Sequence, residues 1–365
     1  MGNSPVSSLS DAVDAIILVG GQGTRLRPLT LSAPKPMLPT AGVPFLEHPL
    51  SRIRAAGIRH VILSSSYKSE VFESHFGDGS KFGLELDYVV EEEPLGTGGG
   101  IGHAAAAIRA STVLVFNGDL LSGVDLGSLL AVHRERHADV TLYLTRVNDP
   151  RAFGCVPTDS SGRVTAFLEK DPDPITDQIN AGTYVFERHV VDAIPSGRPV
   201  SVERETFPQM LKAGATVIGQ VQDGYWRDLG TPADFVAGSA DLVRGIAPTL
   251  ALPAGSGERI VLHGADVDPT ATVDGGSTVG ASAVVGAGAE VAGSVLFDDA
   301  VVEAAAVVRR SVIGRGARVA AGAVVVDAVL GDRAIIGSGN ELAAGARVWP
   351  DVTLAPDSLR FSPPS

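Results

Sequence analysis

Residues 267–291 read VDPTATVDGGSTVGASAVVGAGAEV, and valine recurs at every sixth position of this stretch. An amphipathic α-helix has 3.6 residues per turn, so it cannot keep a period of six on one face, and the frequent glycines make a helix costlier still. A period of six is typical of hexapeptide repeats, in which each short strand turns one aliphatic side chain inward. The stretch therefore predicts a β-helix.

The same period continues toward the C-terminal end. Fifteen aliphatic positions with three faces per coil predict about five coils, enough for a continuous core. Breaks in phase between residues 291 and 295 and between 325 and 330 predict altered corners or small loops. The three predicted inward series are Val267, Val273, Val279, Val285 and Val291; Val295, Val301, Val307, Ile313, Val319 and Val325; and Leu330, Ile336, Leu342 and Val348.

A stretch rich in proline, glycine and serine, Gly245–Gly257, precedes the repeats and is typical of a linker. The composition also changes there, because all five lysines lie at or before residue 212 and aromatic residues become rare after about residue 260. We therefore predict a first domain over residues 1–245, a linker over 246–259, the β-helix over 260–352 and a tail over 353–365.

Upstream of the linker, short β-branched runs alternate with helical patterns. This alternation predicts βαβ units, and hence an α/β domain with a Rossmann-like, mostly parallel sheet and a ligand site at the carboxyl ends of its strands. The predicted strands are Ala15–Val19, Val61–Ser64, Leu86–Val90 and Val113–Phe116, and the predicted helices are Phe45–Ala56, Gly100–Arg109 and Leu126–His137.

The charge balance excludes several classes of partner. The chain has 29 Lys and Arg against 42 Asp and Glu, a net charge of -13, which argues against binding to nucleic acid or to an anionic membrane. A single cysteine, Cys155, cannot form an internal disulfide, and the first apolar run is too short for a signal or membrane segment. We expect a soluble, cytoplasmic protein whose Cys155 is a buried structural thiol.

The first predicted strand leads into Gly20-Gly21-Gln22-Gly23-Thr24-Arg25, and Lys35 follows between two prolines. A glycine-rich turn lets backbone N–H groups approach an anion, and the two cationic side chains can neutralise phosphate charge. The stretch lacks the Gly-Lys-Ser/Thr of a Walker A loop and the glycine spacing of a dinucleotide fold. It therefore predicts a phosphate-binding loop of another kind.

Six motifs in this order resemble those of the sugar-phosphate nucleotidyltransferases, and Pro34-Lys35-Pro36-Met37 most resembles the mannose-1-phosphate guanylyltransferase branch. The family resemblance covers residues 14–350 and implies that the β-helix is left-handed. The six motifs are Gly20–Met37, Glu93–Gly99, Asn117–Asp119, Phe167–Lys170, Asn180–Gly182 and Trp226–Pro232.

This resemblance implies GTP and mannose 1-phosphate as substrates and Mg²⁺ as cofactor. It implies catalytic roles for Arg25, Lys35, Asp119 and Asp228, the last two as metal ligands, since Mg²⁺ needs few protein carboxylates when phosphates and water supply the rest. The implied nucleotide-binding residues are Val19, Gly20, Gly21, Gly23, Thr24, Arg25, Lys35, Glu93, Leu95, Gly96 and Asp119, and the implied sugar-phosphate residues are Gly118, Glu169, Lys170, Asn180 and Gly182.

Some positions depart from the family pattern, and alternatives stay open. Asp171 stands where many relatives have proline, so the orientation of the Lys170 side chain is less constrained.

The shared motifs bind phosphates and metal, so glucose 1-phosphate with UTP, dTTP or ATP is an alternative substrate pair. A regulatory relative without catalysis is an alternative function. A β-helix acyltransferase is disfavoured because residues 267–348 contain no His and no Lys to act as a base. The flat faces of the β-helix predict a homo-oligomer.

Overall fold

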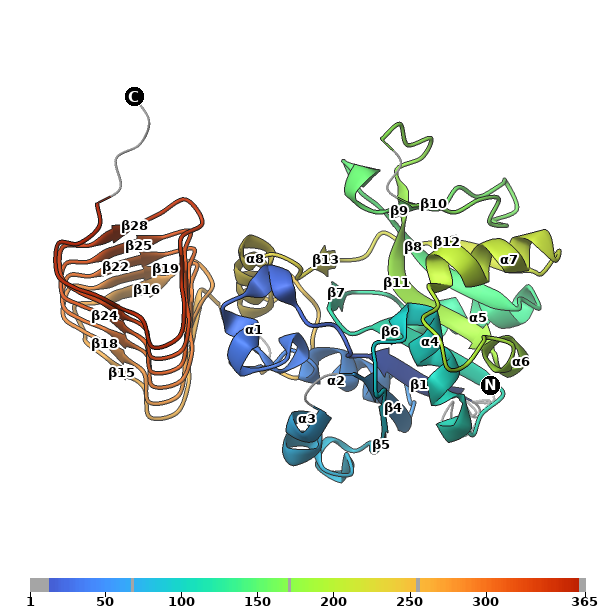
Figure 1. Ribbon diagram of the computed structural model, residues 1–365, viewed down its shortest axis with the longest axis horizontal. Coiled ribbons are helices and arrows are strands. Elements are labelled where there is room, and N and C mark those ends of the chain that lie inside the picture. The colour runs from blue at the N-terminus through green and yellow to red at the C-terminus, as the bar shows by residue number, and fades with distance from the viewer. Residues whose placement is uncertain (1–12, 67–68, 170–171, 254–256, 361–365) are drawn as a thin grey trace, which may run out of the picture. The chain divides into compact units, whose positions relative to one another are not determined.

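The computed structural model describes residues 13–66, 69–169, 172–253 and 257–360 (Figure 1). Its two compact units do not follow the linear order of the chain. One unit, here called the sheet unit, combines the residues up to Gly21 with Pro49–Trp226, and the other, the β-helix unit, combines Gln22–His48 with the residues from Arg227 onward. The linear domain boundaries expected from the sequence stay a prediction.

The sheet unit is built on a nine-stranded sheet with the main strand order β10-β9-β11-β6-β1-β4-β5, while β8 pairs with β11 and β12. The central strands β1, β4, β5 and β6 pair in parallel, and this confirms the Rossmann-like, mostly parallel sheet. The strands are β1 (Val13–Leu18), β4 (His60–Ser65), β5 (Glu85–Val90), β6 (Thr112–Asn117), β7 (Leu120–Ser122), β8 (Val140–Arg146), β9 (Gly154–Cys155), β10 (Leu168–Glu169), β11 (Gln178–Glu187) and β12 (Val217–Val221).

The helices of this part of the chain are short. One prediction was wrong in position: the helix expected over Gly100–Arg109 begins four residues earlier, because the glycines at its start pack closely against Val200, and it ends in a 3-10 turn, η5 (Ala104–Ala107). The helices are α2 (Glu47–Ala55), α3 (Ser69–Phe76), α4 (Gly96–His103), α5 (Leu126–Glu135), α6 (Arg188–Asp192) and α7 (Phe207–Lys212), with short turns at η4 (Ser80–Phe82), η6 (Pro150–Ala152) and the π-helix η7 (Val202–Thr206).

The repeats form three parallel sheets of six, six and five strands, as a left-handed β-helix requires. The first sheet contains β14 (Arg259–Val261), β17 (Ser277–Val279), β20 (Val295–Leu296), β23 (Val312–Ile313), β26 (Val329–Leu330) and β29 (Arg347–Val348). The second contains β15 (Asp266–Val267), β18 (Val284–Val285), β21 (Val301–Val302), β24 (Arg318–Val319), β27 (Ile335–Ile336) and β30 (Thr353–Leu354). The third contains β16 (Thr272–Asp274), β19 (Glu290–Ala292), β22 (Val307–Arg309), β25 (Val324–Val326) and β28 (Glu341–Leu342).

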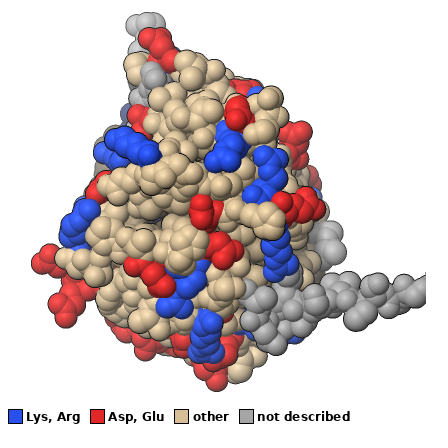
Figure 2. Space-filling model, turned by 90° about the vertical axis from the view of Figure 1, so that its right-hand side faces the viewer, with Lys and Arg blue, Asp and Glu red and all other residues tan. Residues whose placement is uncertain are grey.

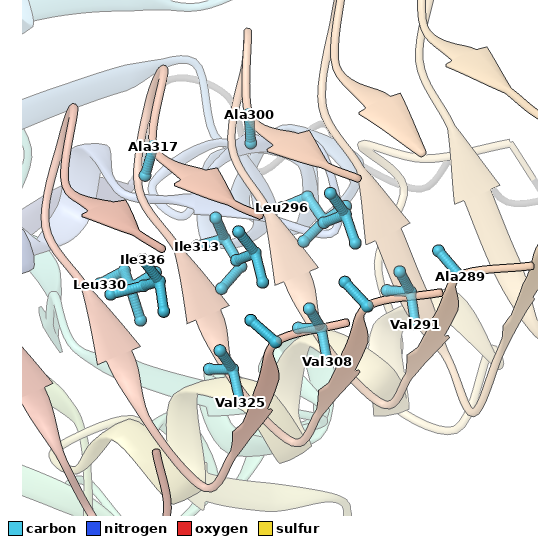
Figure 3. Close-up of a cluster of buried hydrophobic side chains, with 14 of the residues drawn as sticks. Ala289, Val291, Leu296, Ala300, Val308, Ile313, Ala317, Val325, Leu330 and Ile336 are labelled. Atoms are coloured by element: carbon cyan, nitrogen blue, oxygen red, sulfur yellow. The ribbon is translucent and has the colours of Figure 1, made fainter. Parts of the chain in front are cut away.

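The core of the β-helix is a stack of aliphatic and alanine side chains (Figure 3). Part of the predicted inward series was wrong by one residue, because the core residues are Leu296, Val302 and Val308 and not the valine that precedes each of them. The reason is the length of a coil: strand partners lie 17 residues apart between Thr278 and Val329, so one hexapeptide in each of these coils is a residue short. The predicted step from Val325 to Leu330 is one of these short corners.

The segment Gln22–His48 packs within the β-helix unit. It contains η2 (Thr24–Leu26), α1 (Leu29–Ser32), η3 (Lys35–Met37), β2 (Pro39–Thr40) and β3 (Val43–Pro44). The Ala41 N–H donates to Ser239 Oγ at 2.9 Å, on the buried side of α8 (Pro232–Val243), and Gly42 packs against the side chain of Leu262 at the first coil. At the other end of the β-helix, Nη1 of Arg347 donates to the carbonyl oxygen of Arg27 at 2.9 Å.

Candidate functional site

The predicted phosphate loop is folded tightly on itself. Gly23 has a φ of 59°, and a side chain there would press on Thr30 and Lys35, with a Cβ 3.1 Å from that of the lysine. Thr30 Oγ1 donates to the Gly23 carbonyl at 3.0 Å and holds the turn closed. Glycine is therefore required at this position by both conformation and space.

Three of the predicted catalytic side chains converge in the β-helix unit. Lys35 Nζ lies 3.7 Å from Asp228 Oδ1, and Arg25 Nη2 lies 3.6 Å from Asp228 Oδ2. Only 9% of the Lys35 side chain is exposed, whereas Arg25 is 65% exposed. Asp228 ends β13 (Trp226–Asp228), and Gly230 lies so close to the Arg25 guanidinium that a larger residue would displace it. Two cations thus stand at one carboxylate, where a phosphate could join them.

The sheet unit supplies a second group of predicted residues, at the carboxyl ends of β1 and β6. The Gly118 N–H donates to the Leu18 carbonyl at 2.9 Å, and a Cβ at Gly118 would lie 2.5 Å from that oxygen. The absence of a side chain therefore lets the end of β6 approach β1, and Asp119 follows directly in a partly exposed position. Beside it, the Val19 N–H donates to the Ser64 carbonyl at 2.8 Å, so this amide is already engaged.

The predicted nucleobase loop is anchored by a residue that the sequence reasoning missed. Glu91 is buried, with 7% exposed, and its Oε2 accepts the Leu95 N–H at 2.8 Å while Oε1 accepts from Ser64 Oγ at 3.2 Å. Glu93 is exposed. Glu91 is the first of three consecutive glutamates, and nothing in the sequence distinguishes it as the buried one. Its role emerges only when β4 and β5 are placed side by side.

The sequence reasoning also missed the segment 198–205, which forms backbone hydrogen bonds with the same loop. The Gly98 and Gly99 N–H groups both donate to the Val200 carbonyl, at 2.8 and 3.2 Å, and the Val200 N–H donates to the Leu95 carbonyl at 2.8 Å. Gly96, with a φ of 70°, could not carry a Cβ without approaching the Val200 carbonyl to 2.8 Å. The glycines of the motif are thus required by this close backbone packing.

The side chain of Glu203 holds the segment 198–205 in place. Its Oε2 accepts from Thr97 Oγ1 and from Ser201 Oγ, each at 2.9 Å, and Thr97 Oγ1 in turn accepts the Val202 N–H at 3.0 Å. Segments about a hundred residues apart in the chain thereby form one hydrogen-bonded unit around the predicted nucleobase loop.

Glu169, one of the residues predicted to bind the sugar phosphate, lies on β10 and pairs with Gly154 on β9, where a Cβ would lie 2.7 Å from Glu169 Oε2. Arg204 Nη2 lies 3.9 Å from Glu169 Oε1. Lys170 falls outside the described residues. Cys155 is buried within this strand pair, on β9, in agreement with a structural thiol.

Asn180 and Gly182 lie together on β11. Asn180 Oδ1 accepts the Gly182 N–H at 3.1 Å, and Asn180 Nδ2 donates to Tyr184 Oη at 2.8 Å. The amide of Asn180 thus stabilises the strand around Gly182, whose φ is 70°.

The two metal ligands that the resemblance implies are Asp119, which belongs to the sheet unit, and Asp228, which belongs to the β-helix unit. Among the described residues no group of three or more His, Cys, Asp or Glu side chains could hold a metal ion by itself. Two hard carboxylates fit Mg²⁺, which usually takes one or two protein carboxylates and completes its shell with substrate phosphates and water.

The surface view of Figure 2 shows Lys and Arg side chains interspersed with Asp and Glu over the face it presents. Among the described residues, several basic side chains form ion pairs with acidic ones, as do Arg109 with Glu85 and Arg198 with Glu205. Within the part of the chain that the structure describes, no helix has the length and apolar character needed to span a membrane.

Comparison with known proteins assigns both parts of the chain. Residues 14–245 match the family model described as nucleotidyl transferase, and residues 256–358 match the one described as GMPPB C-terminal domain. A mannose-1-phosphate guanylyltransferase of Mycobacterium tuberculosis is 62% identical over 351 residues, which cover 96% of this chain and 98% of that protein. The catalytic subunit beta of the enzyme from Drosophila pseudoobscura pseudoobscura is 36% identical, covering 75% of this chain and 74% of that one.

A solved structure shares the fold of the first part. The crystal structure of HddC from Yersinia pseudotuberculosis complexed with GMP-PN has a TM-score of 0.55 and 29% identity, and it covers 63% of this chain and 99% of that chain.

Proposed function

Because the chain belongs to the nucleotidyl transferase family, we propose that it transfers GMP from GTP to mannose 1-phosphate, forming GDP-mannose and pyrophosphate. The observation that carries this proposal is the similarity, along nearly the whole of both chains, to the guanylyltransferase of Mycobacterium tuberculosis. The C-terminal match points to the same branch of the family.

In the proposed reaction a phosphate oxygen of mannose 1-phosphate attacks the α-phosphorus of GTP. A new bond forms between that oxygen and phosphorus, the bond from the α-phosphorus to the bridging oxygen breaks, and pyrophosphate leaves with the electron pair. No covalent bond to the protein is needed, so catalysis consists of positioning and charge neutralisation. Arg25 and Lys35 would hold the triphosphate and offset the charge that grows on the leaving group.

Asp228 has two functions in this proposal. It orients Arg25 and Lys35, to which it lies within 4 Å, and together with Asp119 it would hold Mg²⁺. The ion, when bound, would neutralise phosphate charge. A buried lysine held by a carboxylate has fewer orientations than a solvated one, so less entropy is lost when the triphosphate binds.

The nucleobase would lie at the loop that contains Glu93, Leu95 and Gly96. Since the Leu95 N–H is engaged by Glu91, recognition of guanine there would use the exposed Glu93 and the backbone near Gly96. The sugar phosphate would contact Lys170, with Glu169, Asn180, Gly182 and Gly118 around the sugar.

A pyrophosphate-release assay tests the proposal. The protein would be offered GTP, ATP, UTP and dTTP in turn, each with mannose 1-phosphate and with glucose 1-phosphate. We expect the highest kcat/KM for GTP with mannose 1-phosphate. A preference for glucose 1-phosphate with another nucleotide would replace the proposed substrates, and no turnover with any pair would favour a regulatory relative.

We also propose that the chain acts as a homo-oligomer in the cytoplasm. Light scattering of the full chain should give a multiple of its 37.5 kDa mass. A monomeric mass at micromolar concentration would contradict the proposed oligomer. The full chain is needed, because removal of the β-helix would also remove the contacts of Leu262 and Arg347 with the segment that carries Lys35.

A further inference from the structure

Tyr184 is a buried tyrosine on β11, between two of the predicted motifs. Its side chain is 0% exposed. The pairing of β11 with β8 is irregular here, because Asn180 faces Leu144 while Tyr184 faces Leu142. Four residues of β11 therefore span the same length as two residues of β8, and the surplus forms a bulge around Gly182.

The bulge is held from inside by the Asn180 side chain. Its Oδ1 accepts the Gly182 N–H at 3.1 Å, and its Nδ2 donates to Tyr184 Oη at 2.8 Å. The amide thus bridges the middle of the bulge and its far end. Because Asn180 is the donor in the second bond, the hydrogen of the Tyr184 hydroxyl remains available for another acceptor.

An acceptor is present on the neighbouring strand β6, which pairs with β11 through Thr183 and Phe116 (Figure 1). Asn117 Oδ1 is buried and has no hydrogen-bond partner among the described residues, yet the Asn117 side chain interacts with Tyr184. A Cβ at Gly182 would lie 2.9 Å from Asn117 Nδ2, so the bulge packs directly on this side chain.

Asn117 begins the turn that presents Asp119, and Asn180 begins the turn at Gly182. We propose that the Tyr184 hydroxyl is a positioning group that joins these two turns, through the hydrogen bond that it accepts from Asn180 and its contact with the Asn117 side chain, and that it thereby sets the geometry of the sugar-phosphate subsite. Burial raises the pKa of Tyr184 well above its usual value, so the hydroxyl stays protonated. This inference rests on the proposed function, since it assigns the Gly182 turn to the sugar phosphate.

The test is Tyr184→Phe, which removes only the hydroxyl and leaves two buried amide groups without it. We expect the KM for mannose 1-phosphate to rise about tenfold, as loss of one buried hydrogen-bonding group commonly costs, with a much smaller change in the KM for GTP. The matched control is Tyr143→Phe. Tyr143 is also 0% exposed and lies on the adjacent strand β8, but its hydroxyl faces Thr145 and Ser122 and neither turn.

A double-mutant cycle with Asn180→Ala separates this role from general packing. If both groups act through one bond, the two changes together should cost less than the sum of each alone. Wild-type KM values in Tyr184→Phe, or equal increases for both substrates, would overturn the inference.

A second readout needs no turnover. Hydrogen exchange at the amides of residues 117–119 and 180–183 should be faster in Tyr184→Phe than in Tyr143→Phe, and unchanged exchange would overturn the inference by itself. If the proposed function itself were wrong, the result would differ from a failure of this inference, because wild type and Tyr143→Phe would also form no GDP-mannose.

Discussion

The ammonium group of Lys35 lies 3.7 Å from the carboxylate of Asp228, with 9% of the lysine side chain exposed. A lysine in this position is held in place before any substrate arrives. It can therefore act on a developing charge without first losing the freedom of a solvated side chain. This distinguishes Lys35 from the exposed Lys212 at the end of α7.

Lys35→Ala should lower kcat by about a hundredfold or more, the scale of losing one preorganised charge-stabilising group, with little change in the KM for mannose 1-phosphate. Lys170→Ala should instead raise the KM for mannose 1-phosphate. Steady-state kinetics with each substrate varied in turn measures both effects, and Lys212→Ala is the control with wild-type values. Equal effects of Lys35→Ala and Lys170→Ala on both substrates would show that the two roles are wrongly assigned.

Replacement of either predicted metal ligand should nearly abolish turnover. Asp119→Asn and Asp228→Asn keep the shape of the side chain but remove a charge, and a chelator should inactivate the wild-type protein in the same way. The measurement is turnover against Mg²⁺ concentration, with Asp223→Asn as the control. If Asp228→Asn were fully active at saturating Mg²⁺, this carboxylate would serve only to orient Arg25 and Lys35.

Glu91 should control nucleotide recognition without being exposed to the base. In Glu91→Gln the charge that holds the Leu95 N–H and the Ser64 hydroxyl is lost, so we expect the KM for GTP to rise about tenfold. The preference for GTP over ATP should fall at the same time. The neighbouring Glu92 is exposed and provides the control Glu92→Gln. A Glu91→Gln protein with wild-type nucleotide preference would mean that the loop keeps its shape without this anchor.

Two buried histidines should affect stability at opposite ends of the pH range. Burial would lower the pKa of His60, but the carboxylates of Asp14, 3.0 Å from Nδ1, and of Asp87, hydrogen-bonded to Nε2 at 2.9 Å, outweigh it and raise the pKa above 6.5. Its contribution is then complete below pH 6.5 and is lost as the pH rises through the raised value. Burial lowers the pKa of His48 to about 4 despite its hydrogen bond to Thr40, so its contribution is lost as the pH falls from 6.5 toward 4.

Urea unfolding between pH 4 and 9 should therefore show that His60→Gln flattens the alkaline limb of the stability profile, whereas His48→Gln flattens the acid limb. The two variants serve as controls for each other. An unchanged alkaline limb in His60→Gln would mean that this histidine is not charged between its two carboxylates.

The sequence alone predicted the parts of this protein that repeat or that carry unusual residue types. Aliphatic residues six apart indicated the β-helix, and glycine, arginine and lysine after a strand indicated a phosphate loop, whose binding role stays a prediction. It did not reveal Glu91 or Glu203, since a glutamate becomes distinctive only when burial and a specific N–H or hydroxyl partner are known. The prediction that Val295, Val301 and Val307 face the core was wrong, because each is followed by another aliphatic residue. Only the 17-residue length of the coil decides which of the two faces the core.

The packing of Gln22–His48 within the β-helix unit has a consequence for synthesis of the protein. On the ribosome this segment emerges long before its partners Ser239, Leu262 and Arg347, the last of them 320 residues after Arg27. Contacts so distant in sequence cannot form until the intervening chain exists. The nascent chain can pair β1 with β4 and β6 before the β-helix exists, but the loop that carries Arg25 and Lys35 reaches its final packing only after Arg347 has been made.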